Sequence, residues 1–190
     1  MIKRCAWCSD DPLYIEYHDT EWGVPLHDER RLFEMLCLEG AQAGLSWITI
    51  LKKRDGYRKA FDNFEKEKIV LYSDDDIERL RADSNIVRNK LKIRSVVQNA
   101  KSVLQLYEEG KTLDSYLWDY VDGVPIQNQW KSQSELPATR PLSEKMSKDL
   151  KKRGFKFIGP TICYALMQSI GMVNDHLVDC CRYEAVKEKR

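Results

Sequence analysis

Apolar side chains recur at helical spacing along most of this chain, and that periodicity limits the possible folds more than any other feature. Between residues 87 and 107, Val96, Ala100, Val103 and Tyr107 follow one another at intervals of three or four. This spacing gives one apolar face to a long amphipathic helix. Neither strand-like alternation nor a repeat of fixed period recurs in the sequence. The sequence therefore predicts an all-α fold.

Shorter helices are predicted on either side of the long one. They cover residues 28–39, 45–51, 66–72, 113–120, 141–154 and 161–170, and a further helix bearing Ile77 and Leu80 begins at Ser73 or Asp74. Residues 122–140 contain Gly123, Pro125 and Pro137 and are predicted to form an extended connection. A chain of 190 residues suits a single domain, 1–190, of about eight to ten helices.

Cysteines and histidines lie near both ends of the chain. His18 follows Cys5 and Cys8, and His176 precedes Cys180 by four residues, which places both side chains on one face of a helical turn. One pair from each end would make a tetrahedral Cys2His2 zinc site. Four protein ligands leave no open position, so the metal would be structural. The alternative is that these cysteines are small apolar residues and the histidines are incidental.

The redox state of the cysteines follows from the expected compartment. The N-terminus shows no signal peptide, and no apolar run approaches the roughly 20 residues of a membrane span, so we expect a cytoplasmic protein with reduced thiols. The CxxC spacing of Cys5 and Cys8 also admits a thiol redox protein, although no βαβ pattern surrounds it. Cys37 and Cys163 fall within apolar helical segments and are predicted to be core residues.

Glu39 is an unusual residue for its position. It follows Leu32 by seven residues, on the apolar face that Leu36 shares. A lone buried carboxylate is costly, so Glu39 should be paired or serve a site, unless the helix frays at Gly40 and exposes it. The first quarter of the chain also holds many aromatic residues. An aromatic box with a carboxylate suits a flat ligand that is cationic or donates hydrogen bonds. The candidates for this box are Trp7, Tyr14, Tyr17, Trp22 and Trp47.

The charge is unevenly distributed along the chain. The formal net charge is +1, but residues 1–39 hold four Lys or Arg against nine Asp or Glu, so residues 40–190 carry +6. Basic clusters lie at 52–54, 86–94 and 148–156. Each cluster is either a solvated helix face or a surface for phosphates.

Seven blocks of sequence form a distinctive ordered set. They are CAW at 5–7, DPLYIEYHD at 11–19, EWGVP at 21–25, LFEM at 32–35, LEGAQAGLSW at 38–47, KKRGFKFIG at 151–159 and GMVNDH at 171–176. These blocks closely resemble the DNA-3-methyladenine glycosylase I family of the helix-hairpin-helix DNA glycosylases, and the resemblance spans about residues 4 to 183.

The resemblance implies a helix-hairpin-helix element over about residues 74–107. It also implies a zinc ion (Zn2+) that ties residues 1–25 to 171–185. The implied ligands are Cys5, His18, His176 and Cys180, which leaves Cys8 and Cys181 as non-ligands.

The resemblance further implies the residues that contact DNA and base. Glu39 and Tyr17 would act in a base pocket, Trp47 would stack on the flipped base, and Tyr14, Trp7 and Trp22 would line the pocket. The hairpin at 83–88, with Asn85, Ile86 and Arg88, would hold a phosphate. Gln42 and Leu45 would fill the gap in the duplex, or would instead pack between helices. The family has Gly at Asn85 and a small residue at Leu91; we expect Asn85 to tolerate a left-handed turn and Leu91 to pack.

The implied activity is hydrolysis of the N-glycosidic bond of 3-methyladenine in double-stranded DNA by base flipping. Many related enzymes use an Asp downstream of the hairpin to support the sugar cation and water, and residues 98–107 contain none. The implied reaction is simple hydrolysis that leaves an abasic site without cutting the strand. We expect a monomer with no membrane partner. The alternative is a non-catalytic, zinc-stabilised module that binds DNA or a modified base.

Overall fold

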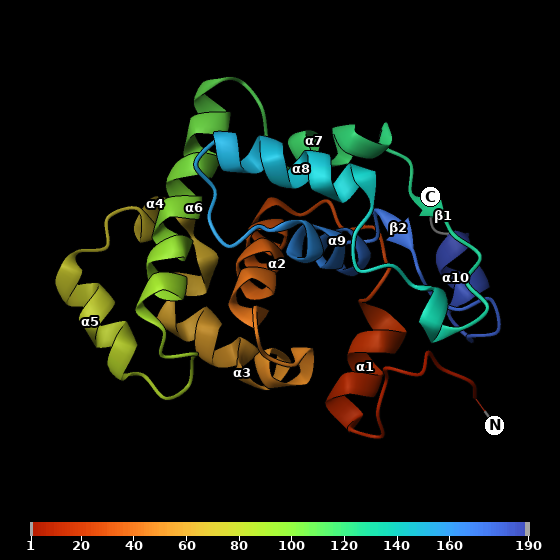
Figure 1. Cartoon of the computed structure of the whole chain (residues 1–190). Helices are drawn as coiled ribbons and strands as arrows, with labels where there is room; N and C mark the ends of the chain where they lie inside the picture. Colours follow the sequence, from red (N-terminus) through yellow and green to blue (C-terminus); the bar gives the residue numbers. More distant parts are fainter. Residues whose placement is uncertain (1, 189–190) are drawn as a thin grey trace.

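A single helix, α2 (Glu29–Gln42), runs through the centre of the molecule, and every residue of it from 32 to 41 is buried. Four helices pack directly against it: α3 (Trp47–Ala60), α6 (Lys90–Glu108), α7 (Leu113–Trp118) and α9 (Pro160–Ser169). The computed structural model describes residues 2–188 and is shown in Figure 1. Because α2 is surrounded on all sides, a polar side chain near its C-terminal end has few routes to water.

The other helices form an outer layer. They are α1 (Pro12–Thr20), α4 (Lys66–Ile69), α5 (Asp74–Ala82), α8 (Pro141–Lys152) and α10 (Tyr183–Lys187). Helix α8 packs on α9, and α4 and α5 pack on α6 (Figure 1). Three 3-10 turns occur at Asp62–Phe64, Asp119–Val121 and Gln133–Glu135. The fold is mostly helical, as the prediction of an all-α fold from the periodicity requires, apart from two short strands.

Local sequence determines where most helices begin. The Asp28 side chain accepts a hydrogen bond from the backbone N–H of Arg31, which caps α2. Ser73, one of the two predicted caps, forms a capping box with Asp76 at the start of α5. The segment predicted at 45–51 begins at Trp47, after a turn at Gly44, and continues to Ala60 as α3.

Two helices and two strands differ from the sequence prediction. Helices α1 and α10, near the two ends, were not predicted. Two short strands, β1 (Ile126–Gln127) and β2 (Val173–Asn174), pair in parallel, with Ile126 opposite Val173. Two residues per strand are too few to produce an alternating pattern. The predicted extended connection at 122–140 therefore includes a strand that attaches it to the C-terminal region.

The two ends of the chain lie on the same side of the molecule (Figure 1). The backbone N–H of Cys181 donates a hydrogen bond of 2.8 Å to the carbonyl of Lys3. Within residues 2–188, no helix is long and apolar enough to cross a membrane.

Candidate active site and metal centre

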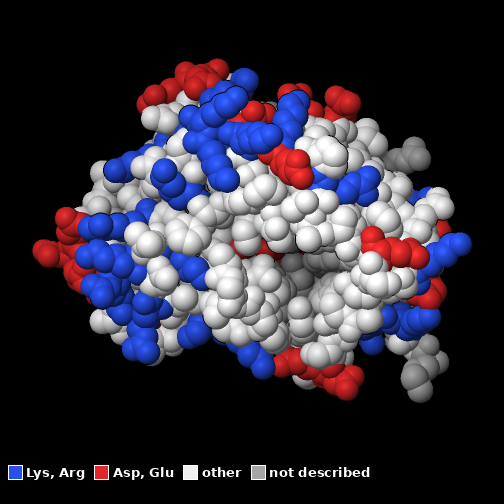
Figure 2. All heavy atoms as spheres, viewed as in Figure 1, with Lys and Arg blue, Asp and Glu red and all other residues white. Residues whose placement is uncertain are grey.

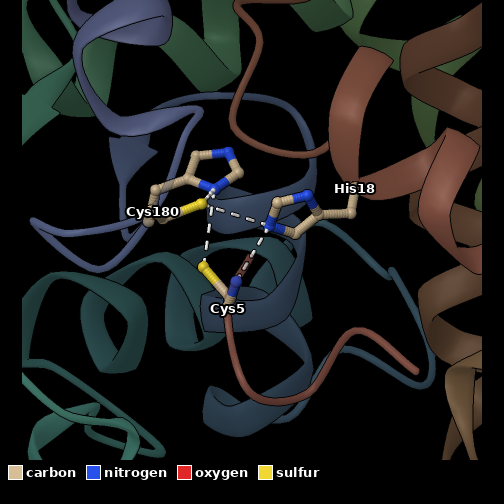
Figure 3. Close-up of side chains that lie close together, drawn as sticks. Cys5, His18 and Cys180 are labelled. Carbon is tan, nitrogen blue, oxygen red and sulfur yellow. Dashed lines mark hydrogen bonds between the residues drawn. The ribbon is translucent and has the colours of Figure 1, made fainter. Parts of the chain in front are cut away.

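Four predicted metal ligands from opposite ends of the chain meet in the interior. The ligand atoms of Cys5, His18, His176 and Cys180 all lie within 4.8 Å of one another, and all four residues are buried (Figure 3). The Cys180 sulfur is 3.5 Å from His18 Nε2 and 3.5 Å from His176 Nδ1. A tetrahedral zinc ion at about 2.3 Å from sulfur and about 2.0 Å from nitrogen separates sulfur from nitrogen by about 3.5 Å. The four residues therefore fit a tetrahedral zinc ion.

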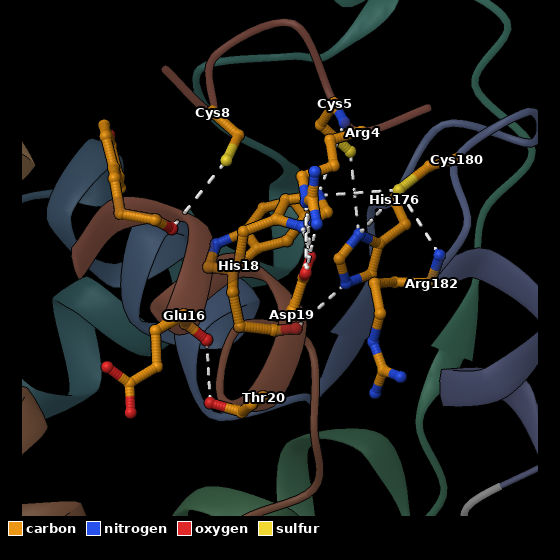
Figure 4. Close-up of polar contacts among 12 residues, drawn as sticks. Arg4, Cys5, Cys8, Glu16, His18, Asp19, Thr20, His176, Cys180 and Arg182 are labelled. Carbon is orange, nitrogen blue, oxygen red and sulfur yellow. Dashed lines mark hydrogen bonds and ion pairs between the residues drawn. The ribbon is translucent and has the colours of Figure 1, made fainter. Parts of the chain in front are cut away.

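The second nitrogen of each histidine also has a partner. His18 Nδ1 lies 2.7 Å from the Asp19 carboxylate, and His176 Nε2 lies 2.9 Å from the carbonyl oxygen of Trp22. A carboxylate or carbonyl acceptor at one nitrogen fixes the imidazole tautomer that directs the other nitrogen's lone pair toward a metal. Arg4 in turn holds Asp19 by hydrogen bonds from Nε and Nη2 (Figure 4). These outer contacts orient the ligands before any ion binds.

The remaining cysteines are separate from this cluster. Cys8 directs its sulfur to the backbone carbonyl of Tyr14, 3.8 Å away (Figure 4), and Cys181 is exposed. Because Cys5 and Cys8 point to different partners, the thiol redox alternative loses its geometric basis. Cys37 and Cys163 are buried among apolar residues, which confirms that they are core residues.

An aromatic cavity lies beside the Cys/His cluster, with Trp7 in contact with both. The ring centroids of Trp7 and His18 are 5.2 Å apart, and Trp7 also packs at 4.9 Å on Trp22 and at 5.1 Å on Tyr14. The cavity has a volume of about 290 Å³. It is lined by all six predicted base-pocket residues, Trp7, Tyr14, Tyr17, Trp22, Glu39 and Trp47, and also by Gln42, Gln133, Leu136, Pro137, Ala138, Ala165 and Gln168.

Glu39 is the buried carboxyl group of this cavity. Its side chain is 3% exposed and α2 continues to Gln42, so the alternative in which the helix frays at Gly40 is wrong. Burial raises the pKa of Glu39 to about 8, and the neighbouring Ser169 hydroxyl opposes this rise in part. Burial likewise raises the pKa of the Tyr17 hydroxyl. The cavity therefore holds a neutral phenol next to a carboxyl group that binds or releases a proton near neutral pH.

Three buried polar atoms of the cavity residues have no hydrogen-bond partner among the described residues 2–188. They are Oε2 of Glu39 and the indole N–H groups of Trp7 and Trp47. Orphaned buried polar atoms are uncommon, and when they gather in one cavity they indicate a site for a polar ligand. The acceptor and the two donors suit a planar ligand with both kinds of group at its edge.

One wall of the cavity was not predicted from the sequence. It is formed by the 3-10 turn Gln133–Glu135 and the three residues after it, within the predicted connection. The buried Asp175 carboxylate fixes this wall and α9. It accepts hydrogen bonds from Trp130 Nε1 at 2.8 Å and from Gln168 Nε2 at 2.8 Å. Asp175 also directly precedes His176, one of the four residues of the Cys/His cluster. The same short segment therefore positions both the cavity wall and the cluster.

The hairpin between α5 and α6 is fastened to α3. The backbone N–H of Val87 donates to the Tyr57 hydroxyl, and Lys53 Nζ donates to the carbonyl of Ser84. Gly56 lies directly beneath the turn, where an added Cβ would be 2.4 Å from the carbonyl oxygen of Asn85. Since α3 begins at Trp47 in the cavity, one rigid helix links the cavity to the hairpin.

Asn85 in the hairpin and Leu91 in the first turn of α6 depart from what was expected. In the described part of the chain, left-handed backbone at residues other than glycine occurs at positions 62–64, 122 and 157, so Asn85 does not adopt it. Its backbone and side-chain N–H groups instead donate to the Asp83 carboxylate. Ile86 is buried as a whole residue, with 1% of its surface exposed. The prediction that Leu91 packs is wrong, because its side chain is 67% exposed.

Positive charge gathers on the face into which the cavity opens. Figure 2 shows a hollow near the middle of this face, with Lys and Arg residues to the left, over the hairpin region, and above, over α8. Among residues 2–188, Arg88 has no ion-pair partner, and neither do Lys148, Lys151 and Lys156. The cluster at 52–54 differs, because Lys52 pairs with Asp11 and Arg54 with Glu21.

Comparison with known proteins agrees with this geometry. The sequence profile described as methyladenine glycosylase matches residues 7–183. The chain belongs to this family. DNA-3-methyladenine glycosylase 1 of Escherichia coli is 50% identical over 186 residues, which is 98% of this chain and 100% of the relative.

Solved structures of the methyladenine glycosylase family superpose closely on this fold. A crystal structure of a 3-methyladenine DNA glycosylase I has a TM-score of 0.93 and 49% identity, covering 94% of this chain and 98% of the other. The Staphylococcus aureus 3-methyladenine DNA glycosylase I, studied for its recognition of 3-methyladenine, has a TM-score of 0.92 and 39% identity, covering 95% and 96%.

Proposed function

We propose that this protein removes 3-methyladenine from alkylated double-stranded DNA by hydrolysing its N-glycosidic bond. The observation that carries the proposal is the unpaired Glu39 carboxyl oxygen in a cavity walled by tryptophan and tyrosine rings. Membership of the methyladenine glycosylase family supports it, as does the 3-methyladenine activity named for the relatives.

The chemistry of the substrate explains this choice of residues. An adenine methylated at N3 carries a positive charge while it is attached to the sugar. When the bond to C1′ breaks, its electron pair passes to the base and neutralises it, and water supplies the hydroxyl to C1′ and releases a proton. The base therefore needs little help from a general acid. What the protein must supply is extrusion of the nucleotide and recognition of the lesion.

Each cavity residue has a role in recognition. Glu39 accepts hydrogen bonds from the edge of the base, and the positive charge of the bound lesion favours the carboxylate form of Glu39 over the protonated form that burial favours. Trp47 stacks on the flipped base and adds a cation–π contribution. Tyr17 lies against Trp47, with ring centroids 5.4 Å apart, and holds its position. Tyr14, Trp7 and Trp22 close the remaining sides.

The DNA backbone would meet the hairpin and the positive face of Figure 2. Helices α5 and α6 with the turn between them serve as a helix-hairpin-helix element, in which Arg88 and the backbone near Asn85 and Ile86 contact phosphate. Two residues would fill the space that the flipped nucleotide leaves. They are Gln42, in the cavity lining, and Leu45, which is 40% exposed.

The four-residue cluster would hold one structural zinc ion. Cys5 and Cys180 would bind it through thiolate sulfur, His18 through Nε2 and His176 through Nδ1. When bound, the ion supplies cross-linking rather than chemistry at the base, because four protein ligands fill a tetrahedral shell.

Chromatography of the bases released from methylated duplex DNA tests this function. The wild-type protein should release free 3-methyladenine, and Glu39→Gln should fold but release it at least about 100-fold more slowly. Glu16→Gln, at an exposed position on α1, serves as the matched control. Binding to methylated duplex without any free base would favour a non-catalytic binding module instead.

A further inference from the structure

The turn that carries Gln42 and Leu45 is held from the opposite side by a lysine of α6. Lys92 Nζ donates hydrogen bonds to two backbone carbonyl oxygens, of Ala41 at 2.8 Å and of Ala43 at 2.6 Å. Both carbonyls lie at the C-terminal end of α2, where helix carbonyls lack intrahelical partners and the helix dipole favours a cation. The side chain thus joins the helix after the hairpin to the helix that carries Glu39.

The geometry of the turn shows what the lysine determines. The backbone N–H of Leu45 donates to the carbonyl of Gln42 at 2.6 Å, Ala43 has φ −45° and ψ 117°, and Gly44 has φ +77°. These angles define a type II turn, which differs from type I in the orientation of its central peptide. The carbonyl of that peptide belongs to Ala43 and is the one that Lys92 holds. Lys92 therefore holds the carbonyl whose orientation distinguishes this turn from type I.

The surroundings of Lys92 differ from those of the exposed lysines that would meet phosphate, such as Lys148 and Lys151. Burial lowers the pKa of its ammonium group, and two carbonyl oxygens occupy donors that a phosphate would otherwise take. Its neighbours Lys90 and Arg94 instead pair with acidic side chains of α5 at the surface.

We propose that Lys92 is a positioning residue for base extrusion: it holds the Gln42–Leu45 turn in the shape that enters the duplex and ties that turn to the helix bearing the hairpin. This inference rests on the proposed function. It assigns Lys92 no contact with the base and none with DNA, so its loss should leave Glu39 and the aromatic walls of the cavity in place while weakening extrusion.

The variant Lys92→Met tests the proposal, because it keeps the length of the side chain and removes its donors. Single-turnover release of 3-methyladenine from duplex DNA should fall about 10- to 100-fold, as expected for misplaced groups. Affinity for free 3-methyladenine should stay within about twofold, since Glu39 and the aromatic rings of the cavity are outside the turn and are untouched. Lys101→Met is the control for lost charge on the same helix, at an exposed position without an ion-pair partner in residues 2–188.

Two further measurements separate positioning from other roles. Hydrogen exchange at the amides of residues 42–46 should become about tenfold faster in Lys92→Met and remain unchanged in Lys101→Met. In Lys92→Met, the affinity for duplex DNA should depend on salt concentration with the same slope as in the wild-type protein. Gly44→Ala strains the same turn at positive φ, so its effect on duplex release should add little to that of Lys92→Met.

Three results would overturn the proposal. One is duplex release by Lys92→Met at the wild-type rate. Another is a slope of log duplex affinity against log salt concentration that is smaller by about one in Lys92→Met, which would mean that Lys92 binds a phosphate directly. The third is a parallel loss of free-base affinity, which would make the residue part of the cavity's support. If the wild-type protein released no base, the proposed function would fail, while the exchange rates at 42–46 would still report whether Lys92 holds the turn.

Discussion

The sulfur of Cys5 lies 3.6 Å from Nδ1 of His176, 171 residues later in the chain. This contact and that of His18 with Cys180 bring the N-terminal and C-terminal segments of the chain together around one small cluster. The aromatic cavity rests against the same cluster, because Trp7 follows Cys5 by two residues and the Trp22 carbonyl contacts His176. A metal ion at the cluster would therefore stabilise one side of the base pocket.

The first prediction concerns metal content. Purified protein should contain about one zinc ion per chain by mass spectrometry. His176→Ala should lose it and unfold at a temperature lower by about 10 °C or more, because metal binding is coupled to folding. Cys181→Ser changes the exposed neighbour of a ligand and should keep both properties. A well-folded wild-type protein that never binds metal would refute the assignment.

The second prediction addresses the residue behind His18. Asp19→Asn weakens the acceptor that fixes the imidazole tautomer, so zinc affinity should fall about 10- to 100-fold in a chelator competition. Asp10→Asn, at an exposed site nearby, should bind zinc as tightly as the wild type. Equal affinity in the two variants would show that Asp19 does not orient the ligand.

The third prediction follows from the raised pKa of Glu39. The folded protein holds the carboxyl proton up to about pH 8, while the unfolded chain releases it near the ordinary value of 4.5. Stability from this group is thus fully present below about pH 4.5 and is lost as the pH rises toward 8. The Glu39→Gln variant has no ionisable group at this position, so it does not lose this stability as the pH rises.

Thermal unfolding across pH checks that reasoning. The melting temperature of Glu39→Gln relative to wild type should rise between pH 4.5 and 8 and level off above 8. We expect a total change of about 5 °C or more. The exposed-site variant Glu16→Gln should show no such trend, and a flat difference for Glu39→Gln would mean that the carboxyl group is ionised in the folded protein at all these pH values.

The fourth prediction tests the link between α3 and the hairpin. Gly56→Ala places a methyl group 2.4 Å from the Asn85 carbonyl oxygen, so the turn must shift. We expect a loss of about 1–3 kcal/mol in stability and about tenfold weaker binding to duplex DNA by fluorescence anisotropy. Asp55→Ala, on the exposed side of α3, should change neither. If Gly56→Ala bound DNA as tightly as the wild type, the hairpin would not contribute to DNA binding.

The helices that were predicted correctly have sequence patterns that lie within the helix itself or next to its first turn. The apolar stripe of α6 and the capping residues Asp28 and Ser73 each lie within one helix or its first turn. Helix α1 had such a signal too, because Asp11 caps it and Pro12 occupies its first position, but its apolar pattern is too weak to identify it.

The features that escaped prediction depend on distant contacts. The cavity wall at 133–138 has no periodicity, and it is placed by hydrogen bonds from Trp130 and Gln168 to Asp175. The role of Lys92 is likewise invisible in its own helix, since its partners are carbonyls of α2 and the following turn. The ligand spacing at each end suggested a metal site, but only the fold joins the two halves.

The most direct test uses a duplex containing a single 3-methyladenine and follows base and strand together. Under single-turnover conditions, liquid chromatography with mass spectrometry should detect one free 3-methyladenine for each abasic site formed, on strands that stay uncut. Base release with cleaved strands would contradict simple hydrolysis by water. Tight binding to the duplex with no free base would contradict the central claim that this cavity removes the alkylated base.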